Sequence, residues 1–130
     1  MVALPAHLSR SRPCILIVDD NPDNTGFLQM FLESEGYVVT VAHSGQEALQ
    51  QIQTTAPQLV LMDVMMPAMD GFAVVRKIRR DRHHRSTPVI LLTAYDEPMA
   101  QGWKLGANDL LQKPVELNEL ISRIQTYLPL

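Results

Sequence analysis

The sequence predicts an α/β fold, a doubly wound five-stranded parallel sheet of order 2-1-3-4-5 with helices on both faces in a three-layer sandwich. Two observations carry this prediction. The short apolar runs Ile15–Val18, Leu59–Met62 and Val89–Leu92 do not alternate with polar residues, which is typical of strands buried on both faces. Segments with helical spacing separate these runs, and right-handed crossovers between parallel strands leave few other topologies.

The first strand is expected at Cys14–Val18. Asn21 is suited to cap the following helix, because Pro22 then occupies the first helical position that proline favours. Gly36 is expected to end this helix. Its apolar residues have helical spacing: Phe27, Leu28, Phe31 and Leu32.

The β-rich run Tyr37–Ala42 predicts the second strand. Ser44–Glu47 has the pattern of a capping box and is expected to open the second helix. Pro57 should break this helix, and Gln58–Met62 is expected to form the third strand. The inward residues predicted for the second helix are Ala48, Leu49 and Ile52.

The turn-rich loop Met66–Gly71 leads into a third helix. The fourth strand follows from Val89, a short fourth helix is expected at Glu97–Leu105, and a short fifth strand at Asp109–Gln112. The third helix is read from Phe72, Val75, Ile78 and Arg79, and the final amphipathic helix from Leu117, Leu120, Ile121, Ile124 and Leu128.

Length and composition set limits on the function. A chain of 130 residues suits one domain, expected at residues 14–128 after a flexible tail at residues 1–13. The net charge of −3 argues against nonspecific nucleic-acid binding, and the single Cys14 excludes an internal disulfide. No membrane span or signal peptide is recognisable, so a cytoplasmic location is expected. We expect a stand-alone protein with no output domain after Leu130.

Polar residues follow the apolar runs at the points where the predicted strands end: Asp19, Asp20, Asp63, Thr93 and Lys113. Ligands of such sheets bind beyond the carboxyl ends of the strands, so these side chains should converge. Three carboxylates in one cleft repel one another unless a cation intervenes, and Mg²⁺ suits oxygen ligands. The ammonium of Lys113 suits a phosphoryl oxygen. The sequence therefore predicts a site for a divalent cation and a phosphoryl group.

Each of these residues also has an ordinary interpretation. Adjacent aspartates favour a helix N-terminus, Asp63 suits a turn, Thr93 suits a strand end, and Lys113 suits solvent. Their combination at neighbouring strand ends favours the site. The segment Arg76–Arg85 holds six of the eleven basic residues, and a solvated helix end is favoured over a patch for an anionic partner.

These motifs together resemble the response-regulator receiver domains of two-component signalling, whose fold is flavodoxin-like. The resemblance extends from Cys14 to Leu128. It rests on Asp19-Asp20, Met62–Gly71, Thr93-Ala94, Gly106-Ala107 and Lys113-Pro114.

The resemblance implies a role for each matching residue. Asp63 would be the phosphoacceptor, and Lys113 and Thr93 would contact the phosphoryl group. Mg²⁺ would be held by Asp19, Asp20, Asp63 and the backbone carbonyl of Met65, and the phosphoryl site would comprise Asp63, Thr93, Ala94 and Lys113. The resemblance also implies a cis peptide at Lys113-Pro114. The protein would phosphorylate and dephosphorylate itself, with no turnover of an external substrate.

The implied partner is a histidine kinase or a histidine phosphotransfer protein. The output would be a shift of the face formed by the fourth helix, the fifth strand and the last helix, read by a downstream protein and not by direct contact with nucleic acid or membrane. Many receivers carry an aromatic residue three positions before the lysine, where Leu110 stands here. Asp109, Glu119 and Arg123 resemble charged dimer residues, but Met99 replaces a basic one, so a monomer or a weak, phosphorylation-dependent homodimer is expected.

Other interpretations remain. The chain could be a receiver cut from a hybrid histidine kinase or from a DNA-binding regulator. A phosphohydrolase of the haloacid-dehalogenase type is disfavoured because Met65 stands where its second aspartate would be needed. A phosphorylation-independent binding module is disfavoured by the complete set of Asp63, Thr93 and Lys113.

Overall fold

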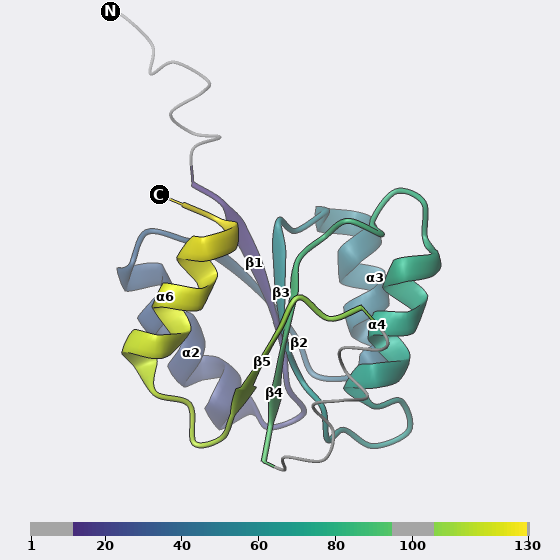
Figure 1. Ribbon diagram of the computed structural model, residues 1–130. Helices are drawn as coiled ribbons and strands as arrows, with labels where there is room; N and C mark the ends of the chain where they lie inside the picture. Colours follow the sequence, from purple (N-terminus) through teal and green to yellow (C-terminus); the bar gives the residue numbers. More distant parts are fainter. Residues whose placement is uncertain (1–11, 95–105, 130) are drawn as a thin grey trace, which may run out of the picture.

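The computed structural model describes residues 12–94 and 106–129 (Figure 1). Five parallel strands form one sheet in the order β2-β1-β3-β4-β5, which confirms the predicted topology. The strands are β1 (Cys14–Val18), β2 (Val38–Ala42), β3 (Leu59–Asp63), β4 (Val89–Thr93) and β5 (Asp109–Gln112). The described helices are α2 (Pro22–Ser34), α3 (Gly45–Thr55), α4 (Gly71–Arg80) and α6 (Leu117–Tyr127). Figure 1 shows α2 and α6 on one face of the sheet and α3 and α4 on the other.

The core has two halves because successive residues of a strand point to opposite faces. In β1, Ile15 and Ile17 pack under α2 and α6, whereas Leu16 and Val18 pack under α3 and α4. All four side chains are fully buried. This burial on both faces explains why the strands read as uninterrupted apolar runs.

Local capping fixes where the helices begin. The side chain of Asn21 accepts a hydrogen bond from the Asp23 amide at 2.9 Å, and Pro22 opens α2 as predicted. Ser44 caps α3 by accepting from the Glu47 amide at 3.0 Å. The capping box is incomplete, because the Glu47 carboxylate accepts from the amide of His43 at 3.3 Å and not from that of Ser44.

Some sequence predictions need correction or lie outside the described residues. Phe27 shares the helical spacing of the other apolar residues of α2 but is 59% exposed, because α2 buries only a narrow stripe that includes Leu28 and Leu32. The predicted helix at 97–105 lies outside the described residues, as do residues 1–11 of the expected tail. The carbonyl of Pro13 already accepts a hydrogen bond from Val38.

Arg79 was assigned to a solvated basic helix end, and this was wrong. Its guanidinium donates to the carbonyls of Gly106 at 2.9 Å and Thr87 at 2.8 Å, and to Oδ1 of Asn108 at 2.7 Å. The same Asn108 oxygen accepts from the amide of Val89. Burial lowers the pKa of the Arg79 guanidinium. Arg79 therefore ties the end of α4 to the starts of β4 and β5.

Candidate functional site

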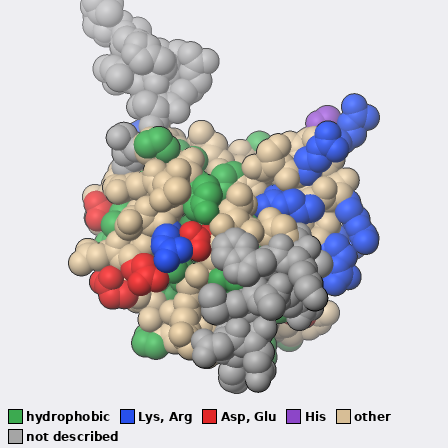
Figure 2. Space-filling view, viewed as in Figure 1, with side chains coloured by type: hydrophobic (Ala, Val, Ile, Leu, Met, Phe, Trp, Pro, Cys, Tyr) green, Lys and Arg blue, Asp and Glu red, His purple; other side chains and the backbone are tan. Residues whose placement is uncertain are grey.

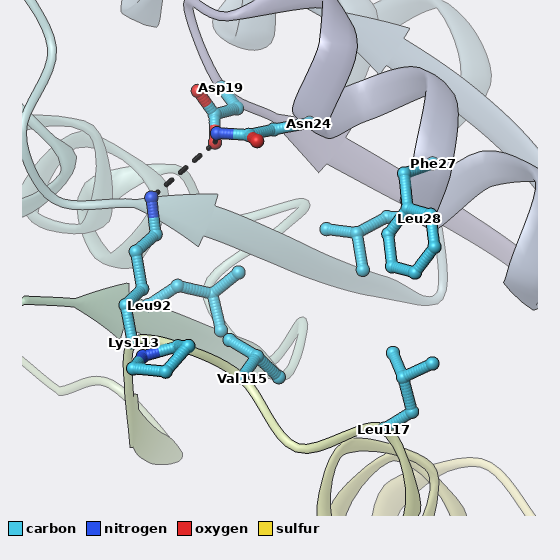
Figure 3. A pocket seen from close by; sticks show the side chains of 9 residues that line it. Asp19, Asn24, Phe27, Leu28, Leu92, Lys113, Val115 and Leu117 are labelled. Atoms are coloured by element: carbon cyan, nitrogen blue, oxygen red, sulfur yellow. Dashed lines mark hydrogen bonds and ion pairs between the residues drawn. The ribbon is translucent and has the colours of Figure 1, made fainter.

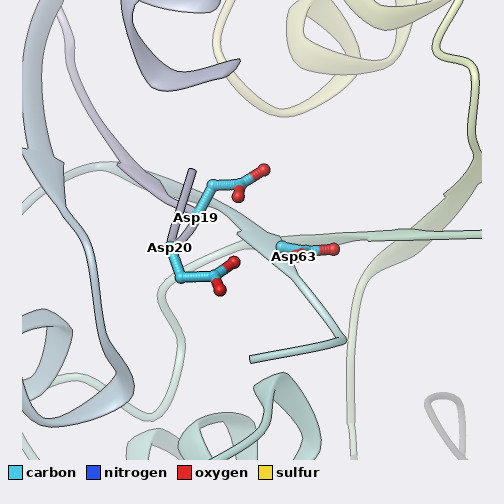
Figure 4. Close-up of side chains that lie close together, drawn as sticks. All are labelled: Asp19, Asp20 and Asp63. Carbon is cyan, nitrogen blue, oxygen red and sulfur yellow. The ribbon is translucent and has the colours of Figure 1, made fainter. Parts of the chain in front are cut away.

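Three carboxylates meet at the carboxyl edge of the sheet. Val18 of β1 lies beside Met62 of β3, so the residues that follow these positions become neighbours. One carboxylate oxygen from each of Asp19, Asp20 and Asp63 lies within 4.8 Å of the others (Figure 4). Asp19 and Asp63 are only 3% and 5% exposed, whereas Asp20 faces solvent. The structure thus brings together the acidic residues singled out from the sequence.

Lys113 supplies the cationic group of this cluster. Its Nζ lies 3.0 Å from Oδ1 of Asp63 and 3.6 Å from Oδ2 of Asp19, the second of which is drawn in Figure 3. The backbone amide of Lys113 donates to the carbonyl of Thr93 at 2.7 Å, which ties the lysine to the end of β4. The Lys113-Pro114 peptide is cis, as expected. One ammonium therefore pairs with two of the three clustered carboxylates, which leaves an excess of negative charge.

The pKa shifts reflect this crowding. Burial raises the pKa of the Asp63 carboxyl, the nearby Asp19 adds to the rise, and Lys113 opposes it. Burial alone lowers the pKa of the Lys113 ammonium, but the carboxylates of Asp63 and Asp19 outweigh it and hold that pKa above its ordinary value. The excess negative charge of these carboxylates is of the kind that a hard divalent cation neutralises.

Asp19 is held in place by groups of the first turn of α2. Its Oδ1 accepts from the amide of Asn21 at 2.9 Å, and its Oδ2 accepts from the side-chain amide of Asn24 at 3.3 Å. Sequence reasoning missed Asn24, although a polar residue in the first helical turn after an acidic pair is a usable signal. Among the described residues, no hydrogen bond or ion pair engages the carboxylate of Asp20. Its oxygens are therefore available to a cation.

The loop after β3 brings the backbone close to the carboxylates. Gly71 donates its amide to the carbonyl of Val64 at 2.9 Å, and a Cβ at Gly71 would lie only 2.6 Å from the carbonyl oxygen of Asp63. Glycine is therefore required where α4 starts against the end of β3. Met65 is 57% exposed beside Asp63, and its backbone hydrogen bond to Asp63 favours the ionised carboxylate.

The remaining predicted residues occupy the β4 and β5 side of the site. Thr93 is buried at the end of β4, and Ala94 is exposed directly after it. Leu110, which stands in place of an aromatic residue, lies opposite Leu91 and belongs to the core under α3 and α4. A small buried leucine at this position leaves no ring whose rotation could report a change at Thr93.

Two of the charged residues expected to lie at a dimer contact pair within one chain. Nη1 of Arg123 lies 2.6 Å from Oδ1 of the buried Asp109, and this carboxylate raises the pKa of the guanidinium. The hydroxyl of Tyr127 donates to the carbonyl of Asn108 at 2.8 Å and lies 3.5 Å from Oδ2 of Asp109. These contacts fasten α6 to the start of β5.

A pocket of about 220 Å³ opens beside the acidic cluster (Figure 3). Asp19 and Lys113 form its polar end. Its other walls are mostly apolar and come from α2, β4, the segment after β5 and the start of α6: Asn24, Phe27, Leu28, Leu92, Pro114, Val115 and Leu117. The site is thus approached past an apolar surface.

Comparisons with known proteins agree with this geometry. The family model of the response regulator receiver domain matches residues 15–125. An uncharacterized 14.6 kDa protein of Leptolyngbya boryana is 43% identical over 87% of this chain and 88% of its own length. The transcriptional regulatory protein YkoG of Bacillus subtilis is 44% identical over 88% of this chain. The solved structure of chemotaxis protein CheY4 of Vibrio cholerae superposes with a TM-score of 0.85 at 31% identity, covering 90% of this chain and 99% of that one.

The relatives differ in how much of their length this chain spans. It spans half of YkoG, 43% of the regulator TrcR of Mycobacterium tuberculosis and 25% of the response regulator PleD of Caulobacter vibrioides. Within residues 12–94 and 106–129, the structure contains no helix with the length and apolar character needed to cross a membrane.

Proposed function

The chain belongs to the response regulator receiver family, and on this premise we propose that Asp63 is the residue that accepts the phosphoryl group. The observation that carries the proposal is the setting of this carboxylate. Asp63 is buried at the end of a central strand, 3.0 Å from the ammonium of Lys113 and within 4.8 Å of two more carboxylates. A carboxylate held in this way is a suitable nucleophile for an acyl phosphate.

The proposed transfer forms one bond to phosphorus and breaks another. An oxygen of Asp63 attacks the phosphorus of a phosphohistidine, the O–P bond forms, and the P–N bond breaks. The imidazole leaves with its electron pair and takes up a proton. The acyl phosphate is later hydrolysed by water, which restores the Asp63 carboxylate and releases phosphate. Phosphoryl transfer depends mainly on positioning and charge neutralisation. Lys113, whose Nζ lies 3.0 Å from the Asp63 carboxylate, is proposed to move to the phosphoryl oxygens.

The donor set suits Mg²⁺, which would supply further neutralisation of the phosphoryl oxygens. Asp19, Asp20, Asp63 and the backbone carbonyl of Met65 are the proposed ligands. The exposed, unengaged carboxylate of Asp20 supports this assignment, as does the orientation of Asp19 by Asn21 and Asn24. We propose that the phosphoryl oxygens contact Lys113 and also Thr93 and Ala94, which follow one another at the end of β4.

The proposed donor is a histidine kinase or a histidine phosphotransfer protein. The donor's histidine must reach a buried carboxylate, so a part of the donor has to enter beside Asp63. The pocket next to Lys113 and the exposed Phe27 at its rim support this approach from the side of α2. The proposed output is a shift of the face that includes β5 and α6. A weak homodimer through this face remains a prediction.

The test is the intact mass of the protein after incubation with acetyl phosphate, which donates the same group without a protein partner. The expected result is a phosphoryl mass gain that requires Mg²⁺, disappears in EDTA and is absent in Asp63→Asn. Asp23→Asn is the matched control, because Asp23 is an exposed carboxylate outside the cluster. The same mass gain in Asp63→Asn as in the wild type would refute the assignment of Asp63.

A further inference from the structure

Positive charge is concentrated in one short stretch of the chain. Residues 76–85 hold six of the eleven Lys and Arg but one of the fourteen Asp and Glu, which leaves five basic and thirteen acidic residues elsewhere. Figure 2 shows blue side chains gathered on the right-hand side of the molecule, where Figure 1 places α4. We call the exposed members the basic flank: Arg76, Lys77, Arg80, Arg82 and Arg85.

The basic flank is not neutralised by the described part of the chain. The ion pairs there involve Lys113 and Arg123 and no residue of the flank. Asp81 is the one carboxylate within residues 76–85, and it is engaged by other groups. Its Oδ1 accepts from the amide of His83 at 2.9 Å, and its Oδ2 accepts from the side-chain amide of Gln53 at 2.5 Å. These bonds lower the pKa of Asp81, and among the described residues no ion pair joins it to a flank cation.

The flank is also presented on a well-anchored support. Arg79 fastens the end of α4 to the carbonyls of Thr87 and Gly106. The following loop closes on itself through bonds from His84 to Asp81 and from Thr87 to His84. A surface that is already ordered loses little conformational entropy when a partner binds. Solvated cations on an unanchored loop would lack this advantage.

A shallow groove adjoins the flank on α3. Its lining carries side-chain amides and a hydroxyl around one leucine: Gln46, Leu49, Gln50, Gln53 and Thr54. Gln53 joins this groove to the end of α4 through its bond to Asp81. Amide and hydroxyl groups can donate to carboxylates, so the groove extends the surface on which an anionic chain could lie.

We propose that the basic flank and this groove dock an acidic segment of a partner protein, a run of Asp and Glu in extended form. Guanidinium groups match carboxylates in a two-pronged geometry, and four of the five flank residues are arginines. A peptide fits better than a nucleic acid, because a long polyanion would extend beyond the flank onto a remainder with an excess of acidic residues. The described flank residues are all charged, which disfavours insertion into lipid.

This surface is separate from the phosphoacceptor site. α4 begins at Gly71 against Asp63 and runs away from it for ten residues, which is about 15 Å of helix. An acidic segment on the flank therefore leaves Asp63 accessible to its donor. The proposal does not depend on the proposed function, and a protein that fails to accept phosphate can still be tested for this binding.

The experiment uses fluorescence anisotropy of labelled deca-glutamate titrated with the full chain at low salt. We expect saturable binding that weakens as NaCl is added. The double variant Arg76→Gln/Arg80→Gln removes two flank charges one helical turn apart and should weaken binding by about fivefold or more, from the range measured for exposed ion pairs. Ser122→Glu/Gln125→Glu changes the net charge by the same amount on exposed positions of α6, across the sheet, and should leave the affinity within about twofold.

Labelled decathymidylate, measured in parallel, separates a peptide from a nucleic acid. Deca-glutamate binding that weakens by about fivefold or more in the flank variant and stays within about twofold in the α6 variant supports the proposal. Tighter binding of decathymidylate than of deca-glutamate overturns it in favour of a nucleic-acid surface. Equal weakening in both variants, or no binding of deca-glutamate to the wild type, also overturns it. Circular dichroism of both variants excludes unfolding as the cause.

Discussion

Replacing Asp63 with asparagine should stabilise the folded chain when Mg²⁺ is absent. The substitution keeps the shape of the side chain and removes one of three negative charges that lie within 4.8 Å of one another. The carbonyl oxygen of asparagine can still accept a hydrogen bond from Lys113, whose Nζ lies 3.0 Å from the carboxylate in the wild type. The main change is therefore electrostatic.

The magnitude follows from these distances. At an effective dielectric constant of about 20, two like charges at such a separation repel by about 3.5 kcal/mol, and Asp63 has two such neighbours. At the same dielectric constant, attraction between the Asp63 carboxylate and the ammonium of Lys113 offsets about 5.5 kcal/mol of this repulsion. Repulsion exceeds attraction by about 1–2 kcal/mol, and burial of the charged carboxylate acts in the same direction. We expect a rise of about 1–2 kcal/mol in the free energy of unfolding near pH 7.

The pH dependence has a definite sign. The pKa of Asp63 is raised in the folded state, so the stability linked to its protonation is complete below the unfolded value of about 3.9 and is lost as the pH rises through the folded value. The advantage of Asp63→Asn should therefore be present near neutral pH and should vanish below about pH 4.

Urea unfolding in EDTA, followed by circular dichroism, measures the effect as a rise of about 1 M in the midpoint. Addition of Mg²⁺ should stabilise the wild type more than the variant and so narrow the difference. Asp23→Asn removes an exposed carboxylate outside the cluster and should be neutral or slightly destabilising, because Asp23 lies in the first turn of α2. An Asp63→Asn protein that unfolds at the same or a lower urea concentration than the wild type in EDTA would refute the electrostatic reasoning.

Three further substitutions test other contacts by the same urea assay. Lys113→Met leaves the carboxylates of the cluster without an ammonium. It should lower the free energy of unfolding in EDTA by about 1–3 kcal/mol, and Mg²⁺ should restore part of this loss. An equal loss with and without the metal would contradict this expectation. Gly71→Ala places a Cβ 2.6 Å from the carbonyl oxygen of Asp63. It should lower the free energy of unfolding by about 2 kcal/mol or more and slow labelling by acetyl phosphate. Wild-type stability together with a wild-type labelling rate would be inconsistent with this packing. Arg79→Gln loses hydrogen bonds to several backbone carbonyls and should lower the free energy of unfolding by about 2–3 kcal/mol. The exposed control Arg80→Gln should change this free energy by less than about 0.5 kcal/mol. Similar losses in the two variants would argue against the anchoring role of Arg79.

The sheet and the acidic cluster were predictable because their signals are local. A strand buried on both faces appears as an apolar run, and the bounds of β1 and β5 match the predicted ranges Cys14–Val18 and Asp109–Gln112. The parallel arrangement then brings the residues after these runs to one edge, so the proximity of Asp19, Asp20 and Asp63 follows from topology alone.

The residues that sequence reasoning misplaced depend on partners distant along the chain. Arg79 bonds to Gly106 and Asn108, which are 27 and 29 positions away, so its neighbours in sequence gave no sign of burial. Phe27 has the helical spacing of a core residue, but the width of the buried stripe on α2 is set by how the helix lies on the sheet.

The arrangement around Lys113 links the acidic cluster to the opposite end of β5. The side chain of Lys113 serves two carboxylates, while its backbone amide is bonded to Thr93, so a new position of the ammonium acts on the ends of β4 and β5 together. At the start of β5, Asp109 is paired with Arg123 of α6, and Asn108 is joined to Arg79 of α4 and to Tyr127 of α6. These contacts fasten both ends of β5, which is only four residues long. Because Leu110 gives β5 no aromatic ring to turn, we expect a charge change at Asp63 to reach α6 through movement of this short strand.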